Sequence, residues 1–275
     1  MAAAPCNGEV GRVDSAGCPV EYAVYGEGPV SLLLVHGAGA HRQWWYRVEP
    51  ALAAECRVIT VDASGHGNSG RRTTYGVETF ARDIVAVVQH VSDGGPLVVA
   101  GHSAGGRWAG VANSLMPGAA SRLVVMDSQF PPVDLGRRTV GRQRAMRYYP
   151  SRDAARRSFR LVPKQPEPAE EFLEPVFDYS VLSTDSGWCW KADTKTMTYR
   201  EDALVLEHFA NLDLPITYAY GALSSLRPEF TVEAFSSIRP DAEMIRIEGG
   251  YHHLPLDSPQ QCIDVLRDAV RDEAQ

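Results

Sequence analysis

The sequence predicts an α/β protein whose mostly parallel sheet is covered by helices on both faces. Short runs of apolar and β-branched residues recur along the chain, and segments with the 3.6-residue period of amphipathic helices separate them. Continuous apolar strands that alternate with helices are typical of parallel sheets buried on both faces. With 275 residues, 44% of them hydrophobic, the chain is long enough for one large domain with a substantial core.

The predicted strands are short apolar segments bounded by Gly, Pro, Asp or Ser. In chain order they are VEYAVYG (20–26), SLLLVHG (31–37), RVITVD (57–62), PLVVAGHS (96–103), RLVVMDS (122–128), PITYAYG (215–221) and EMIRIEGG (243–250). The segments with helical period are 77–91, 104–116 and 259–270.

Residues 131–214 interrupt this alternation. The segment contains RRTVGRQRAMRYYP, the proline-rich PKQPEPAEEF and the aromatic SGWCWKAD, with no strand of the preceding type. It is too long for an ordinary loop. We therefore expect residues 131–214 to form a helical lid, inserted into a core made of residues 1–130 and 215–275.

Charge and cysteine spacing exclude several classes of protein. A net charge of −7 provides no basic surface for a nucleic acid. The five cysteines lie far apart with no CxxC pair, which argues against a disulfide framework and against a metal site. No apolar run approaches the length of a membrane span, and the first residues do not resemble a secretory signal. We expect a cytoplasmic protein without a bound metal.

One serine lies where a strand is expected to turn sharply into a helix. The sequence GHSAG, residues 101–105, fits the pattern G-x-S-x-G, and it follows a predicted strand and precedes a predicted helix. Such a turn exposes the serine hydroxyl above the edge of the sheet. Ser103 is therefore the expected nucleophile; a serine that only caps the helix is the alternative.

A serine nucleophile needs a general base, and in this chain order the histidine comes last. The segment IEGGYHHLPLDSPQQ offers His252 and His253 after the final predicted strand. His252 lies closer to the strand end, so it is the expected base. An exchange of roles between the two histidines remains open.

The acid that orients the histidine is harder to find. The penultimate strand is followed by Ser224 and Ser225, where an aspartate would serve, and Glu229 is expected on the next helix. Asp127 ends the preceding strand at the neighbouring carboxyl end of the sheet. We therefore expect Asp127 to be the acid, with Glu229 as another carboxylate to consider and a turn or cap as the alternative role of Asp127.

Acyl transfer also needs N–H donors for the developing oxyanion. The glycine-rich turn LLLVHGAGAH follows a predicted strand, and it contains Ala38. The backbone N–H groups of Ala38 and of Ala104, which directly follows the nucleophile, are the expected pair.

Together these motifs resemble the α/β-hydrolase superfamily. The match rests on HGAGAHRQWW, DASGHGNSG, GHSAGG and GGYHHLPLDSP, which come from both ends of the chain. The resemblance implies an α/β-hydrolase fold with an eight-stranded sheet, a lid after the sixth strand and a Ser-His-acid mechanism without a cofactor. Some lactonases and lipases of the superfamily hold the acid after the sixth strand, which suits Asp127. A serine nucleophile argues against the epoxide-hydrolase and haloalkane-dehalogenase branches.

Tryptophans are the expected lining of a substrate pocket. Trp44 follows the oxyanion turn, and Trp188 and Trp190 lie in the insertion. They would favour a small apolar or aromatic substrate, although core packing is the commoner role of such residues. A homodimer is also considered.

The sequence thus predicts a serine hydrolase that cleaves a carboxylic ester, lactone or thioester. An acyltransferase or cyclase, or a carbon–carbon bond hydrolase, could use the same residues. A ligand-binding receptor without catalytic activity is the alternative from another class of protein.

Overall fold

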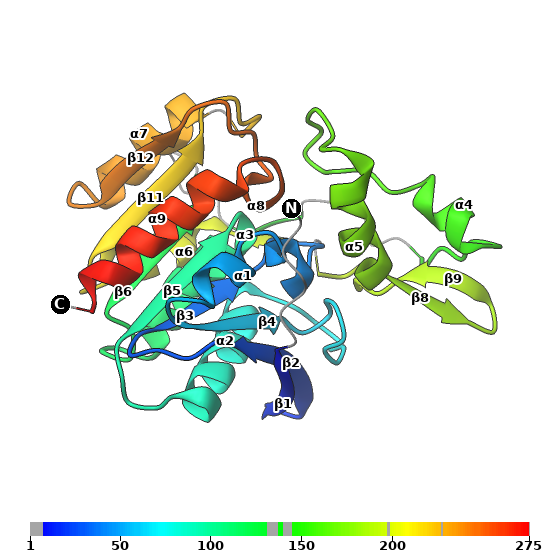
Figure 1. Ribbon diagram of the computed structural model, residues 1–275, viewed down its shortest axis with the longest axis horizontal. Helices are drawn as coiled ribbons and strands as arrows, with labels where there is room; N and C mark the ends of the chain where they lie inside the picture. Colours follow the sequence, from blue (N-terminus) through cyan, green and yellow to red (C-terminus); the bar gives the residue numbers. More distant parts are fainter. Residues whose placement is uncertain (1–7, 131–136, 140–144, 197–198, 227, 275) are drawn as a thin grey trace.

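An eight-stranded sheet forms the centre of the protein in the computed structural model (Figure 1), which describes residues 8–130, 137–139, 145–196, 199–226 and 228–274. Its strands are β1 (Glu9–Ser15), β2 (Cys18–Tyr25), β3 (Ser31–Val35), β4 (Arg57–Asp62), β5 (Leu97–His102), β6 (Arg122–Met126), β11 (Ile216–Gly221) and β12 (Glu243–Ile247). The spatial order is β1-β2-β4-β3-β5-β6-β11-β12. The pairs β1/β2 and β2/β4 are antiparallel, and all others in this sheet are parallel. The predicted fold class is confirmed.

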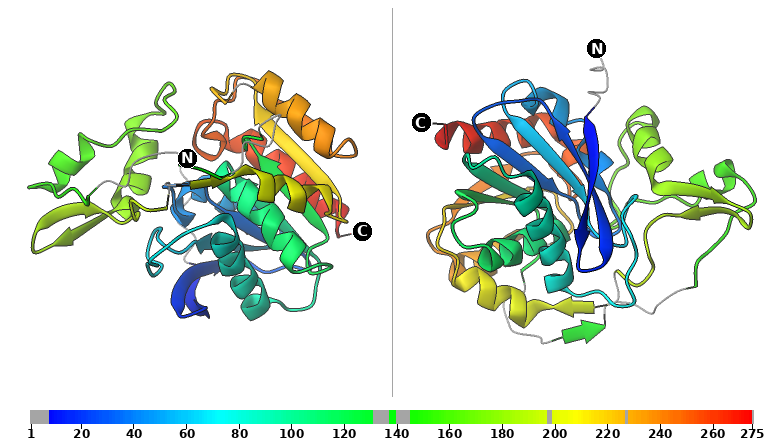
Figure 2. Two further views of the ribbon diagram at one scale, coloured as in Figure 1. Left: turned by 180° about the vertical axis from the view of Figure 1, so that it is seen from behind. Right: turned by 90° about the horizontal axis from the view of Figure 1, so that it is seen from below.

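Helices cover both faces of the sheet, as the two views of Figure 2 show. The helices of one face are α2 (Val77–Val91), α3 (Ala104–Leu115), α6 (Asp202–Ala210) and α7 (Pro228–Ile238). The other face carries α1 (Glu49–Leu52) and α9 (Pro259–Asp272). The short elements η1 (Arg42–Trp45), a 3-10 helix, and α8 (Leu254–Asp257) lie in the loops that follow β3 and β12.

The central strands divide the core into two layers. In β3, Leu33 and Val35 pack under α2 and α3, whereas Leu32 and Leu34 pack under α1 and α9. All four side chains are fully buried, which explains the continuous apolar run in the sequence. Burial of one such side chain contributes about 2 kcal/mol to folding, so the buried strands hold the carboxyl edge of the sheet in place.

The insertion stands beside the sheet in Figure 1, and its small hydrophobic core also includes Ala40, Trp44 and Leu256 from the loops after β3 and β12. Its elements are β7 (Arg137–Thr139), α4 (Arg152–Arg156), α5 (Glu170–Ser180), β8 (Val181–Thr184), β9 (Gly187–Trp190) and β10 (Tyr199–Glu201). β8 pairs with β9, and β7 pairs with β10. The insertion therefore contains strands as well as helices, and its description as helical was incomplete. A two-residue turn at 185–186 joins β8 to β9, and Gly187, the first residue of β9, has a φ of 111°.

Helix α6 belongs by its packing to the sheet rather than to the rest of the insertion. Val205 and Phe209 lie in the core layer that α2 and α3 also cover. A Cβ on Gly110 of α3 would meet the Phe209 ring at 2.1 Å, so the glycine allows the two helices to approach closely. Although residues 131–214 were expected to form one insertion, α6 packs with the helices that cover the sheet.

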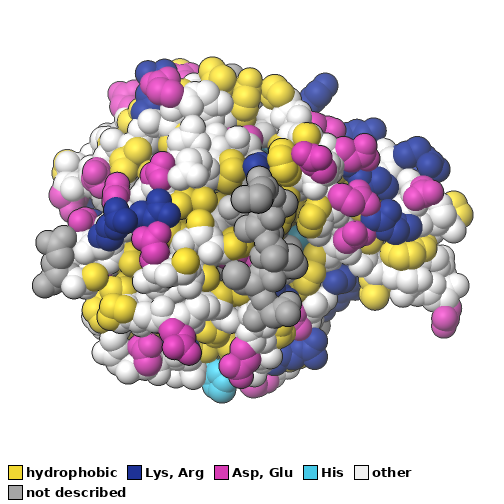
Figure 3. Space-filling view, in the orientation of Figure 1, with side chains coloured by type: hydrophobic (Ala, Val, Ile, Leu, Met, Phe, Trp, Pro, Cys, Tyr) yellow, Lys and Arg dark blue, Asp and Glu magenta, His cyan; other side chains and the backbone are white. Residues whose placement is uncertain are grey.

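Charged side chains of both signs gather over the insertion in Figure 3. Arg152 and Arg156 of α4 pair with Glu174 of α5, and Arg152 also pairs with Asp178. These pairs are partly exposed, so each contributes little on its own and together they align the two helices.

Within the described residues, no helix has both the length and the apolar character needed to cross a membrane.

Candidate active site

Ser103 lies at the turn between β5 and α3, in a backbone conformation that few residues other than glycine adopt. Its φ is 55° and its ψ is −124°. The N–H of Ser103 donates to Met126 O at 2.8 Å, which ties the turn to β6. A Cβ on Gly105 would lie 2.3 Å from His36 O, so only glycine allows this turn to pass so close to β3.

His252 and Asp127 form a buried pair at the same edge of the sheet. His252 Nδ1 lies 2.6 Å from Asp127 Oδ2, and each residue is 3% exposed. Because a carboxylate only accepts, Nδ1 carries the proton and Nε2 is left as an acceptor. Asp127 directly follows β6 with φ 45°, a second strained residue at this edge. This is the arrangement that a general base and its orienting acid require.

Two further donors hold the Asp127 carboxylate. The N–H of Gly221 donates to Oδ1 at 3.1 Å, and the hydroxyl of Ser224 donates to Oδ2 at 2.6 Å. Both donors come from the end of β11, the strand after which an acid was looked for in the sequence. Glu229, the other carboxylate considered, is exposed in the first turn of α7.

The two other histidines nearby are neutral and hold the backbone. His102 Nε2–H donates to His252 O at 2.7 Å, and burial holds the pKa of His102 well below its ordinary value. His253 Nε2–H donates to Pro163 O at 3.2 Å, and burial lowers the pKa of His253 to about 3. Of the two adjacent histidines, His252 contacts Asp127 and His253 contacts the insertion.

The expected oxyanion donors flank Ser103. Ala104 is the first residue of α3, so its N–H has no partner inside the helix. Ala38 lies in the turn after β3, which the N–H of Ala40 closes onto Gly37 O at 3.1 Å. A Cβ on Gly37 would lie 3.1 Å from Ser103 Cβ, so this turn passes directly beside the serine.

Two cavities meet at Ser103. The larger, of about 460 Å³, lies between the sheet edge and the insertion. The second, of about 320 Å³, extends over α3 toward Tyr75, Phe80 and Trp108. The residues that line both are Ala38, Ser103, Val162, Thr196 and His252. The shared part thus contains the serine, the histidine and one expected oxyanion donor.

Two of the three expected pocket tryptophans line the larger cavity. They are Trp44 of η1, which is 8% exposed, and Trp190 of β9. Trp188 does not line it. Trp188 precedes Trp190 by two residues in β9, and its backbone pairs with that of Tyr149. Trp188 therefore does not lie where it was expected, in the lining of the larger cavity.

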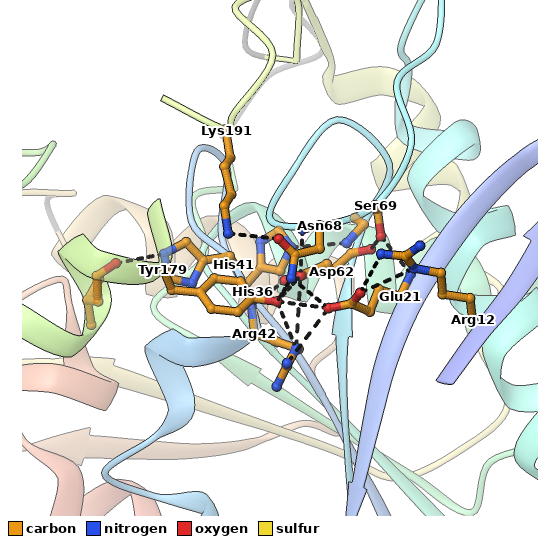
Figure 4. Close-up of polar contacts among 12 residues, drawn as sticks. Arg12, Glu21, His36, His41, Arg42, Asp62, Asn68, Ser69, Tyr179 and Lys191 are labelled. Carbon is orange, nitrogen blue, oxygen red and sulfur yellow. Dashed lines mark hydrogen bonds and ion pairs between the residues drawn. The ribbon is translucent and has the colours of Figure 1, made fainter. Parts of the chain in front are cut away.

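A partly buried polar network joins the insertion to the sheet beside this cavity (Figure 4). Tyr179 of α5 donates its hydroxyl hydrogen to Asp62 Oδ2 at 2.8 Å. The same hydroxyl oxygen accepts from Arg42 Nε and from Asn68 Nδ2, each at 3.0 Å. Glu21 Oε1 lies 3.7 Å from the Arg42 guanidinium. Tyr179 Oη also lies 3.0 Å from Glu21 Oε1. One tyrosine thus contacts three segments of the core, which contain Glu21, Arg42 and residues 62–68.

His41 makes a second link to α5. Its Nε2 lies 3.1 Å from Val176 O and 2.8 Å from Ser180 Oγ. Burial lowers the pKa of His41 to about 3, so the ring is neutral and donates through Nε2. Since His41 ends the oxyanion turn and Arg42 follows it, α5 supports this turn from both residues.

Sequence reasoning overlooked the network and the role of Ser224. The motif DASGHGNSG contains Asp62 and Asn68, but nothing local to it indicates a partner more than 100 residues away. Arg107 of α3 makes another long-range contact, because its Nη2 lies 2.6 Å from the buried carboxylate of Asp202. For Ser224 a signal did exist, because the sequence has a serine where an acid was expected.

Comparison with known proteins agrees with this architecture. The family model described as "Alpha/beta hydrolase family" matches residues 32–265. The thioesterase domain from the curacin biosynthetic pathway has a similar structure, with a TM-score of 0.78 and 24% identity over 94% of this chain and 99% of that domain.

Two relatives match different lengths of the chain. The pimeloyl-[acyl-carrier protein] methyl ester esterase of Aeromonas hydrophila is 23% identical over 273 residues, which cover 90% of this chain and 97% of that protein. The 30 kDa subunit of the magnesium chelatase of Rhodobacter capsulatus is 39% identical over 93 residues, a match that spans only 32% of each protein. On the family match and the shared architecture, the chain belongs to the alpha/beta hydrolase family of enzymes.

Proposed function

We propose that this enzyme is a serine hydrolase that cleaves a carboxylic ester, with Ser103 as nucleophile, His252 as general base and Asp127 as the orienting acid. The observation that carries the proposal is the buried contact of 2.6 Å between His252 Nδ1 and Asp127 Oδ2, beside the cavities that Ser103 lines. A serine hydroxyl is rarely ionised near neutral pH, so it requires a base of this kind.

The proposed reaction has two half-reactions. Ser103 Oγ attacks the carbonyl carbon while His252 Nε2 takes the hydroxyl proton. The N–H groups of Ala38 and Ala104 stabilise the oxyanion, and each such donor contributes about 3 kcal/mol to the transition state. The bond to the leaving group then breaks, and His252 returns the proton to the departing oxygen. Water repeats the sequence on the acyl-serine and releases the acid.

The comparisons favour an ester over a lactone or a thioester. The relative that aligns over 97% of its own length is named a methyl ester esterase. The thioesterase domain is under 25% identical, so its likeness concerns the fold alone. Trp44 and Trp190 favour a substrate with an apolar or aromatic part in the larger cavity, under a lid made by the insertion.

Hydrolysis of a short nitrophenyl ester by the purified protein tests the proposal. We expect turnover by the wild type and a loss of at least about a thousandfold in Ser103→Ala, because removal of a nucleophile leaves only binding and oxyanion stabilisation. Ser225→Ala is the matched control, since Ser225 is exposed. Equal rates for the wild type and Ser103→Ala would refute the assignment.

The other candidate reactions give different results in the same assay. An acyltransferase would divert the acyl group to an added alcohol, so the ratio of ester to acid among the products separates transfer from hydrolysis. A receptor would bind a ligand without turnover, and Ser103→Ala would bind it equally well.

A cytoplasmic location and a homodimer are also proposals. The four cysteines of the described residues are buried free thiols, which suits a reducing compartment. Cell fractionation tests the location, and light scattering after size-exclusion chromatography tests the dimer.

A further inference from the structure

Ser224 makes two hydrogen bonds whose directions are determined by its partners. The N–H of Leu226 donates to Ser224 Oγ at 3.2 Å, and Ser224 Oγ lies 2.6 Å from Asp127 Oδ2. The carboxylate can only accept, so the hydroxyl hydrogen points at Asp127. Ser224 is 8% exposed, and water therefore has little access to compete for this bond.

The oxygen that Ser224 contacts is the one that contacts the histidine. Asp127 Oδ2 accepts from Ser224 and from His252 Nδ1, each at 2.6 Å, while Oδ1 accepts from the N–H of Gly221. The three donors together prevent rotation of a carboxylate that extends from a strained residue. Without the hydroxyl, Oδ2 would retain only the histidine.

The turn that carries Ser224 is also attached to the loop that carries the histidine. The N–H of Leu223 donates to Gly250 O at 2.9 Å, and the N–H of Ala222 donates to Ile247 O at 3.0 Å. The turn after β11 is therefore fixed relative to Asp127 and to the loop that leads to His252.

We propose that Ser224 is a positioning residue that holds the Asp127 carboxylate against His252. This inference rests on the proposed function.

The first experiment removes the hydroxyl and measures ester hydrolysis. Ser224→Ala should lower kcat about tenfold and leave KM unchanged, because a hydrogen bond to a charged group is lost while the substrate cavity stays intact. Ser224→Thr keeps a hydroxyl and should regain most of the activity, and Ser225→Ala should behave as the wild type. If Ser224→Ala does not fold, Ser224→Cys replaces it, because the thiol has a similar shape and is a weaker donor. Its kcat should fall by less than tenfold.

A spectroscopic readout does not depend on substrate. The proton on His252 Nδ1 should give a low-field NMR resonance that is absent in His252→Ala. In Ser224→Ala this resonance should shift or broaden, and in Ser225→Ala it should not change. The thermal unfolding midpoint of Ser224→Ala is measured alongside. If Ser224 had only a structural role, a Ser224→Ala protein with an unchanged midpoint would also show an unchanged resonance.

A Ser224→Ala protein with wild-type kcat and an unchanged resonance would overturn the positioning role. If the wild type itself hydrolyses no ester, the proposed function fails instead, and the resonance still decides whether Ser224 holds Asp127.

Discussion

Tyr179 donates a hydrogen bond of 2.8 Å to Asp62 Oδ2, and this contact joins helix α5 of the insertion to the end of strand β4. Asp62 is fully buried, and its other oxygen accepts from the N–H of Arg42 at 2.7 Å, directly after the oxyanion turn. Burial raises the pKa of Tyr179, so its hydroxyl keeps the proton that it donates. The position of the insertion and the shape of the oxyanion turn therefore depend on the same carboxylate.

Tyr179→Phe should weaken this connection. We expect the free energy of unfolding to fall by about 2 kcal/mol, because the fully buried Asp62 loses a donor. Urea unfolding measures the change. Tyr148→Phe is the matched control, since Tyr148 lies in the insertion and is 49% exposed. Equal stability of the two variants would show that the contact contributes nothing to folding.

Trp190 and Trp188 provide a matched pair for the substrate cavity. Both are half-buried residues of β9, and only Trp190 lines the larger cavity. Trp190→Ala should raise KM for a naphthyl ester about tenfold, because apolar contact area is lost. The same variant should leave KM for a small acetate ester nearly unchanged. If Trp188→Ala had the larger effect on the naphthyl ester, the cavity would not be the binding site.

Asp127→Asn tests the choice of acid. The amide has no negative charge to stabilise an imidazolium, and its NH2 group can donate to Nδ1 and favour the wrong tautomer of His252, so kcat should fall on the order of a thousandfold or more. Glu229→Gln should have no effect, since Glu229 is exposed on α7. Steady-state kinetics on one ester distinguishes the two. The reverse result would assign the acid to Glu229.

Glu49 predicts a pH dependence of stability. Glu49 is 4% exposed, and burial raises its pKa from 4.5 to about 7. The folded protein thus holds this proton more tightly than the unfolded chain. The contribution to stability is complete below pH 4.5 and is lost as the pH rises through 7. A shift of this size corresponds to about 3 kcal/mol.

Glu49→Gln isolates that contribution from other titrating groups. The variant should lack this part of the decrease in unfolding free energy between pH 4.5 and 8, and it should be more stable than the wild type at pH 8. Urea unfolding at a series of pH values measures both curves. Parallel curves would mean that Glu49 has its ordinary pKa in the folded protein.

The elements of the central sheet could be predicted because their signals are local. The helix predicted at 77–91 coincides with α2, and the helix predicted at 104–116 ends one residue beyond α3. The runs SLLLV and LVVAGH are buried on both faces, which is why they are apolar apart from Ser31 and His102 at their ends. The strained turn at Ser103 could also be predicted, because its glycines lie close to the serine in the sequence.

Within the insertion the local signals were weaker. The hairpin of β8 and β9 was not predicted, since its strands are only four residues long and one of them is mostly exposed. Helix α6 was assigned to the lid by its position in the chain. Its packing on α3 depends on Phe209 and Gly110, which are about 100 residues apart. No local sequence pattern indicates that these two residues are in contact.

By itself, the sequence determined the fold class, the strand-turn-helix around Ser103 and the order of the candidate residues along the chain, because periodicity and glycine placement act within a few residues. Only the tertiary structure decided which carboxylate lies against His252, that Ser224 holds that carboxylate, and that Tyr179 joins the insertion to Asp62. Those contacts join residues 97 to 125 positions apart. Their distances follow from the packing of the whole sheet and its helices, which no local pattern records.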